Sequence, residues 1–222
     1  MQPRPLGATG LRVTPVGLGL AALGRPAYID LGRDADLGPA RDVEALERRC
    51  HQVLDELTRL RDQGVAIGLS ASGPAQAATI RRALELTTAG KAPFACVQAT
   101  WNLLEPSAGP ALAEAGQGGW GVVVKEAVAN GRLTPHGRDP ATQALARIAA
   151  THDVGIDAVA LAAVLANPWA GVVLSGAVTP AQLESNLAAP QVELHAAELE
   201  ELAALAEPPD QYWRHRATLS WS

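Results

Sequence analysis

A lysine and a glutamate stand side by side where a short apolar run ends. The run GVVVKE, Gly121 to Glu126, predicts a buried strand whose last two residues are Lys125 and Glu126. An adjacent amine and carboxylate can act as a general base and a general acid, because each can take up or release a proton beside a substrate. These two residues are the catalytic candidates that the sequence offers, for a site without redox chemistry. An ion pair between them is the simpler interpretation.

The other residues that could act as nucleophiles or metal ligands are scattered. Cys50 and Cys96 lie far apart and belong to no CxxC motif or Cys/His cluster, so we expect core thiols and neither a metal site nor a disulfide framework. The two tyrosines, Tyr28 and Tyr212, are expected to have structural roles. The five histidines fall on predicted helices, a loop and the tail, where surface or capping roles are expected.

Composition argues against two classes of function. The net charge is -5 and the acidic residues are dispersed, so the chain lacks the basic surface that nucleic acids require. No run of 18 apolar residues occurs, and the N-terminal segment carries proline and glycine where a signal peptide needs an apolar core. We therefore expect a cytoplasmic protein with neither nucleic acid nor membrane as a partner.

Strand and helix patterns alternate after residue 55, which is typical of βα units around a parallel sheet. The predicted strands are Val65–Ser70, Phe94–Thr100, Gly121–Glu126 and Gly171–Ser175. The predicted helices are Ala75–Leu86, Ser107–Ala115, Ala141–Thr151, Asp157–Ala166, Gln182–Ala188 and Ala196–Ala206. The apolar runs fit strands that are buried on both faces.

Both ends of the chain resemble the aldo-keto reductase family. RPLGATGLRVTPVGLGLAALG, Arg4 to Gly24, is similar to the family's N-terminal hairpin and first barrel strand, and the chain from Leu57 onward is similar to its C-terminal half. The resemblance implies a (β/α)₈ barrel with the tail packed over it. Such a barrel has roughly 250 residues, about 30 for each unit, so 222 residues leave room for about five units.

The resemblance therefore implies an α/β fold with an incomplete TIM-type (β/α) barrel, about five of eight parallel strands retained and the helices outside. The predicted helix Val43 to Asp55 continues directly into ELTRLRDQGVAIGLS, which is similar to the fifth unit, so units two to four are expected to be missing. A deletion between short repeats at Val53-Leu54-Asp55 would leave this junction; a natural short paralogue and an alternatively defined product stay open. We expect a single truncated domain over 1–222, divided into 1–55 and 56–222.

The missing units are those that carry the family's catalytic Asp, Tyr, Lys and His. In the family the tyrosine donates a proton to the nascent alkoxide, the lysine lowers its pKa, the aspartate pairs with the lysine, and the histidine orients the carbonyl. None of the four has a matching position in this chain. The resemblance therefore implies an oxidoreductase fragment, a pseudoenzyme with little or no carbonyl reductase activity alone.

What remains is similar to the family's NAD(P)(H)-binding side. The matching positions, from the nicotinamide to the adenine, are Ser70, Gln98, Lys125, Gly131, Ser175, Gly176, Thr179, Gln182 and Asn186. Lys125 falls where the family has an aromatic residue that stacks on the nicotinamide, and Ala71 replaces an asparagine. The start of a helix suits a phosphate, although a plain loop and helix cap is the alternative. Val178 replaces a commonly basic residue, so the choice between NADP and NAD stays open.

Three functions stay open. An arc of strands five to eight and one would leave two unpaired edges, from which we expect an open half-barrel, self-association or poor folding. The chain is a reductase fragment with a residual dinucleotide site, an active NAD(P)H-dependent carbonyl or alcohol oxidoreductase completed by a partner or a swapped protomer, or a non-catalytic partner of a full-length paralogue.

Overall fold

The computed structural model describes residues 2–13, 16–18, 54–88 and 90–219 of the 222-residue chain. The predictions for Tyr28, for Cys50 and for most of the helix Val43 to Asp55 lie outside these residues. The described chain continues that segment as a helix over residues 54–62.

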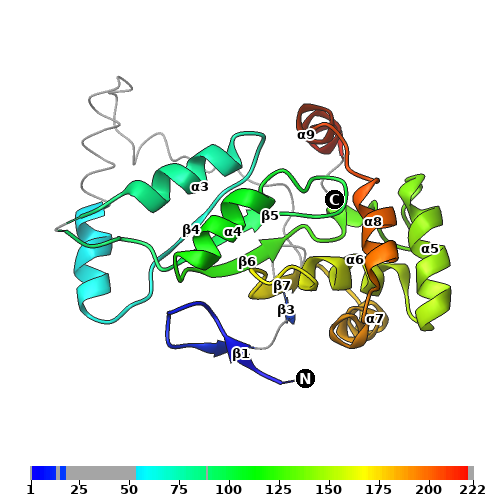
Figure 1. The fold of residues 1–222 in the computed structure, drawn as a ribbon, viewed down its shortest axis with the longest axis horizontal. Helices are drawn as coiled ribbons and strands as arrows, with labels where there is room; N and C mark the ends of the chain where they lie inside the picture. Colours follow the sequence, from blue (N-terminus) through cyan, green and yellow to red (C-terminus); the bar gives the residue numbers. More distant parts are fainter. Residues whose placement is uncertain (1, 14–15, 19–53, 89, 220–222) are drawn as a thin grey trace.

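A five-stranded parallel sheet forms the centre of the fold (Figure 1). Its strands are β3 (Val16–Leu18), β4 (Gly68–Ser70), β5 (Cys96–Thr100), β6 (Gly121–Lys125) and β7 (Val172–Ser175). They lie in the order β3-β7-β6-β5-β4, so the first strand neighbours the last, as in the predicted arc. Within the described residues the sheet stays open: no pairing joins β3 to β4.

The helices up to α8 (Ala196–Ala203) follow the strands in the predicted order, whereas helix α9 (Pro209–Thr218), in the tail, was not predicted. Before these come α3 (Gln76–Glu85), α4 (Gly109–Gln117), α5 (Ala141–His152), α6 (Ile156–Leu165) and α7 (Pro180–Ala188), with short 3₁₀ turns η2 (Ala129–Gly131) and η3 (Ala189–Gln191). The element types predicted after residue 55 are confirmed, with ends that differ by a few residues. Strand β4 was predicted to begin at Val65 but begins at Gly68. Its pairing with β5 starts only there, and Val65 is 47% exposed.

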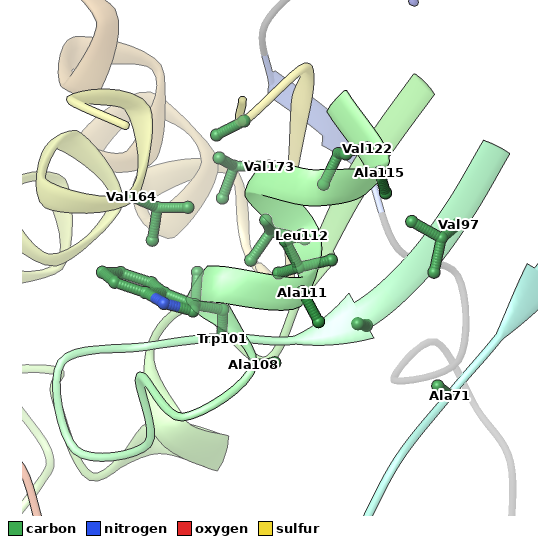
Figure 2. Packing of buried hydrophobic residues seen from close by; sticks show 14 of the residues in the cluster. Ala71, Val97, Trp101, Ala108, Ala111, Leu112, Ala115, Val122, Val164 and Val173 are labelled. Carbon is green, nitrogen blue, oxygen red and sulfur yellow. The ribbon is translucent and has the colours of Figure 1, made fainter. Parts of the chain in front are cut away.

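One face of the sheet is packed against helices. Side chains at alternate strand positions, including Val97, Val122 and Val173, are buried against Leu112 of α4 and Val164 of α6 (Figure 2). Burying a side chain of this size stabilises the fold by roughly 1.5–3 kcal/mol. This layer holds the strand ends in place.

The other face of the sheet is only partly covered. Cys96, Gln98, Val123, Lys125 and Leu174 alternate with the buried positions and all retain some exposure. The prediction of strands buried on both faces is therefore wrong for this face. In a closed barrel these side chains would fill the interior, and the part of the chain that the structure describes places no strands opposite them.

The N-terminal hairpin covers the amino ends of two strands, which confirms the prediction of a hairpin. β1 (Arg4–Pro5) pairs antiparallel with β2 (Arg12–Val13). Arg4 donates hydrogen bonds to the carbonyls of Gly171 (2.9 Å) and Ala170 (2.8 Å), just before β7. The hairpin approaches so closely that a Cβ on Gly7, whose φ is +55°, would lie 2.4 Å from the nitrogen at the start of β6.

Helix α9 lies near the opposite end of the sheet from the hairpin (Figure 1). Asn102, in the loop after β5, donates to the Tyr212 hydroxyl at 2.9 Å, and Arg216 Nε donates to Glu126 Oε2 at 2.9 Å. The structural role predicted for Tyr212 is confirmed by its burial. Among the described helices none is by itself long and apolar enough to span a membrane; α5 and α6 meet the length and hydropathy criteria only when joined, across an 89° bend.

Candidate functional site

The sequence-predicted site residues gather at one end of the sheet. Since all five strands are parallel, their carboxyl ends lie together, and ligands of such sheets bind at that end. β4 ends at Ser70, β6 at Lys125 and β7 at Ser175, while Gln98 lies near the end of β5. Neighbours in the sheet are β4, β5, β6 and β7 in turn, so these residues form a continuous row.

Ser70, Gln98 and Lys125 form the first part of this row. Ser70 is directly paired with Gln98 in the ladder between β4 and β5, so the two side chains leave the same face. Lys125 Nζ donates a hydrogen bond to Ser70 Oγ at 3.2 Å, reaching across β5. The contact joins the ends of β4 and β6, on either side of the strand that carries Gln98.

The Lys125 ammonium is disfavoured by its surroundings. Partial burial lowers its pKa, Glu126 opposes this shift, and the positive charge of Arg216 adds to it. The net direction is downward, so a larger share of Lys125 is neutral amine at a given pH than for an ordinary lysine. A neutral amine can act as a base or a nucleophile.

Glu126 does not form the ion pair with Lys125 that the sequence suggested. Its carboxylate instead accepts hydrogen bonds from Arg216, from Nε at 2.9 Å and from Nη2 at 2.5 Å. Glu126 has a left-handed backbone (φ 58°), which turns its side chain away from the direction of the strand. The acid and base candidates are therefore directed to different partners.

The loop after β6 is held by an arginine that the sequence did not single out. Arg132 is only 10% exposed and binds Asp139 (Nε to Oδ2 2.9 Å) and Glu207 (Nη1 to Oε2 3.2 Å), while its guanidinium lies 5.7 Å from the centroid of the Tyr212 ring. Gly131, just before it, has φ +93°. The contacts fix the loop, and with it Gly131, against the segment before α9.

The loop between β7 and α7 presents a helix start to solvent. Thr179 caps α7, since its hydroxyl accepts a hydrogen bond from the Gln182 backbone N–H at 3.3 Å. The Gln182 side chain accepts from the Val178 N–H at 2.8 Å, which closes the loop. Gly176 is exposed, and a Cβ built on it meets no heavy atom within 4 Å.

Asn186 lies inside the protein rather than on this loop's surface. It is 4% exposed, and its carboxamide contacts Ser175 Oγ and Asp157 Oδ2, both at 2.7 Å, when the nitrogen faces the carboxylate. Asp157 Oδ1 also accepts from Ser185 Oγ at 2.7 Å. Asn186 and Ser175 therefore support the loop from below, and Gly176, Thr179 and Gln182 remain as the groups nearer to solvent.

A cavity in the described part of the protein lies away from these candidate residues. It has a volume of about 720 Å³ and is bounded by Arg4 of the hairpin, Leu165 of α6, Leu187 of α7 and the segment after η3. This is the amino-terminal side of the sheet, away from the row of candidate residues. Within the described part of the chain no three His, Cys, Asp or Glu side chains are grouped so that they could hold a metal ion.

The sequence belongs to the aldo/keto reductase family. The model of that family matches residues 20–207, which is more than half of the chain. A search of the curated proteins found no match.

Solved structures of aldo-keto reductases have a similar fold. A thermostable aldo-keto reductase in complex with the inhibitor epalrestat has a TM-score of 0.57 and 17% identity, with 92% of this chain and 100% of that chain covered. The holo form of an aldo-keto reductase from Bacillus halodurans has a TM-score of 0.54 and 20% identity, with 69% and 55% covered. The aldose reductase from Schistosoma japonicum has a TM-score of 0.52 and 25% identity, with 69% and 47% covered. The match thus spans about half the length of the last two proteins.

Proposed function

We propose that this chain is a truncated aldo-keto reductase that keeps a dinucleotide site and has little or no carbonyl reductase activity alone. The strand order β3-β7-β6-β5-β4 carries the proposal, because it brings the matching positions from Ser70 to Thr179 to one end of one sheet. That end is where parallel α/β sheets bind nucleotides.

The cofactor of the proposed site is NAD(P)(H), which members of the family use. Ser70 and Gln98 would hold the carboxamide of the nicotinamide, with Lys125 beside the ring, and Gly131 would lie along the pyrophosphate. Gly176, Thr179 and Gln182 would hold the adenosine phosphate at the start of α7, where backbone N–H groups favour an anion. The residues present fit this group, since Gly176 has open space beside it. Val178 is 52% exposed and uncharged, so the preference between NADP and NAD stays open.

The proposed fold is an incomplete TIM-type barrel of one domain. Five parallel strands in the order expected for barrel strands five to eight and one support it. Loss of units two to four is the proposed origin. Sequencing the source gene with its flanks tests this origin. A gene that still encodes units two to four would contradict it.

The proposed lack of activity follows from the groups near the strand ends. Reduction of a carbonyl by a nicotinamide needs a proton donor at the nascent alkoxide. Tyr212 cannot supply it, because it is 1% exposed and its hydroxyl is bonded to Asn102. Glu126 is bound to Arg216, so of the candidates that the structure describes at the strand ends Lys125 remains, an amine without a family counterpart.

Thermal unfolding with and without NADPH or NADH tests the dinucleotide site. A cofactor bound only to the folded state at about a hundred times its dissociation constant adds about 2.7 kcal/mol to the free energy of unfolding. We expect one of the two cofactors to raise the transition. Gly176→Leu is the matched control: it should leave the unliganded transition unchanged, because a Cβ at this position meets no heavy atom within 4 Å, and abolish the cofactor shift. Identical shifts in both proteins, or none in the wild type, would contradict the site.

The unpaired edges of the sheet support two alternative functions. Among the described residues the outer edges of β3 and β4 have no strand partner, so a partner chain or a swapped protomer could complete an active oxidoreductase. Oxidation of NAD(P)H with a carbonyl substrate by the purified protein alone would support the swapped form. Co-purification with a full-length paralogue would support a non-catalytic partner.

A further inference from the structure

Lys125 is one of only two lysines in the chain. The other, Lys91, is exposed in the turn that precedes β5, and all other basic side chains apart from the histidines are arginines. Arginine stays protonated in proteins, so Lys91 and Lys125 are the side-chain amines that can lose a proton. Their different surroundings make the chain a natural comparison of a free and a constrained amine.

Among the described residues no carboxylate is hydrogen-bonded to the Lys125 amine. Ser70 of β4 supplies the one hydrogen bond recorded for Nζ among the described residues, at 3.2 Å, and Gln98 of β5 is uncharged. On its own strand Glu126 is the nearest acid, but both of its oxygens are bound by Arg216 of α9. Burial lowers the pKa of Lys125, the Glu126 carboxylate opposes this shift, and the positive charge of Arg216 adds to it.

A hydroxyl beside such an amine completes a recognisable chemical unit. A neutral amine attacks a carbonyl carbon, and the resulting carbinolamine must pass a proton from nitrogen to oxygen before water can leave. Ser70 Oγ can accept and donate a proton and is already within hydrogen-bond distance of Nζ. Both groups stand at the carboxyl ends of parallel strands, where a ligand can reach them.

We propose that Lys125 captures small aldehydes as a reversible imine at the carboxyl end of β6, with the Ser70 hydroxyl relaying the proton. The Nζ lone pair forms a bond to the carbonyl carbon, and the carbonyl π electrons move to oxygen. A proton passes from nitrogen through Ser70 to that oxygen; a second proton, taken from solvent, then protonates the hydroxyl, which leaves as water while the nitrogen lone pair forms the C=N bond of the protonated imine. No electron is gained or lost from outside, so the step needs neither a cofactor nor an oxidant.

This activity lies beyond the proposed dinucleotide binding and does not depend on it. The imine would occupy the place proposed for the nicotinamide, so NADPH and an aldehyde should compete where both bind. The aldehyde-binding amine is a property of β4 and β6, whereas the adenosine phosphate is assigned to the β7–α7 loop.

Reductive trapping tests the proposal on the full-length folded protein. The chain is incubated at pH 7.5 with limiting glycolaldehyde and sodium cyanoborohydride, which reduces an imine to a stable secondary amine, and the initial labelling rates of Lys125, Lys91 and the N-terminal amine are obtained by peptide mass spectrometry. We expect Lys125 to be labelled several-fold faster than Lys91 although it is less exposed. Equal rates, or faster labelling of Lys91, would overturn the proposal.

Two variants separate the chemistry from accessibility. Ser70→Ala should slow labelling of Lys125 several-fold and leave Lys91 unchanged, and Lys91→Arg should leave the rate at Lys125 unchanged. If Ser70→Ala labels Lys125 at the wild-type rate, the relay assigned to Ser70 is wrong. Circular dichroism of each variant confirms that the fold is kept.

The same proteins distinguish this proposal from the dinucleotide site. Selective labelling of Lys125 with no thermal shift by NADPH or NADH would keep the imine and contradict the cofactor. A thermal shift that Gly176→Leu abolishes, with equal labelling of both lysines, would keep the cofactor and contradict the imine. Selective labelling that NADPH suppresses would support both at one place.

Discussion

Tyr212 is the most completely enclosed polar aromatic side chain near the candidate site. It is 1% exposed, its hydroxyl accepts a hydrogen bond from Asn102 at 2.9 Å, and Trp213 packs against its ring at 5.4 Å. Burial raises the pKa of Tyr212 to about 12, because the tyrosinate would lose its hydration. This residue joins the tail to the loop after β5 and has no role in proton transfer at neutral pH.

A raised pKa makes stability depend on alkaline pH. Above pH 10 the unfolded chain releases the Tyr212 proton while the folded chain keeps it, so this contribution is complete below about pH 10 and is lost as the pH rises toward 12. We expect Tyr212→Phe to lower the free energy of unfolding by about 1 kcal/mol at pH 8 through the lost hydrogen bond. Above pH 10 the free energy of unfolding of the variant should decrease less steeply with pH than that of the wild type. Urea unfolding between pH 8 and 11.5 measures both. An unchanged alkaline slope in the variant would contradict the assignment.

The loop after β6 is positioned by ion pairs that cross between elements. Arg132 joins this loop to Asp139, before α5, and to Glu207, between α8 and α9, with side chains only 10%, 11% and 19% exposed. Removal of the cation leaves two enclosed carboxylates without the positive charge that pairs with them, so Arg132→Ala should lower the free energy of unfolding by about 3 kcal/mol. Urea titration at pH 7.5 measures the loss.

An exposed ion pair between two other elements provides the control. Arg147 of α5 binds Glu201 of α8, with side chains 65% and 41% exposed. Solvent screens this pair, so Arg147→Ala should lower the free energy of unfolding by less than about 1 kcal/mol. A loss at Arg147 as large as that at Arg132 would mean that burial does not govern these pairs. If only Arg132→Ala also weakens the cofactor shift, the loop it holds belongs to the site.

At the scale of the whole molecule, the open parallel sheet bears on whether the protein associates in solution. Within the described residues β3 and β4 are each paired on one side only, and Lys125 and Leu174 lie on a face that is partly exposed. Unpaired strand edges favour association with another chain. We therefore expect light scattering coupled to size exclusion to show a dimer or larger species whose proportion rises with concentration.

A single monomeric species over the whole concentration range would contradict this expectation and with it the swapped-protomer alternative. A dimer that shows NAD(P)H oxidation with a carbonyl substrate would instead favour that alternative over the inactive fragment. The dinucleotide site is tested separately, since its thermal shift does not require association.

The elements of this protein were predictable because their signals are local. Four short apolar runs predicted the strands after residue 55, and proline, glycine and helical spacing predicted the helices up to α8, with errors of a few residues at the ends; helix α9 in the tail was missed. The family resemblance added the neighbour relation between the first and last strands. It also pointed to the strand ends as the place of the site, where Ser70, Gln98 and Lys125 are found together.

The partners of the site residues were decided by the tertiary structure alone. Lys125 contacts Ser70 rather than the adjacent Glu126, Glu126 contacts Arg216 of α9, and Asn186 is directed inward. These pairs are far apart in the sequence, so no local pattern encodes them; they depend on which strands are neighbours and on how the tail folds back. Periodicity fixes elements through the burial of one face, whereas the pairing of charges is fixed only when packing brings distant side chains within hydrogen-bond distance.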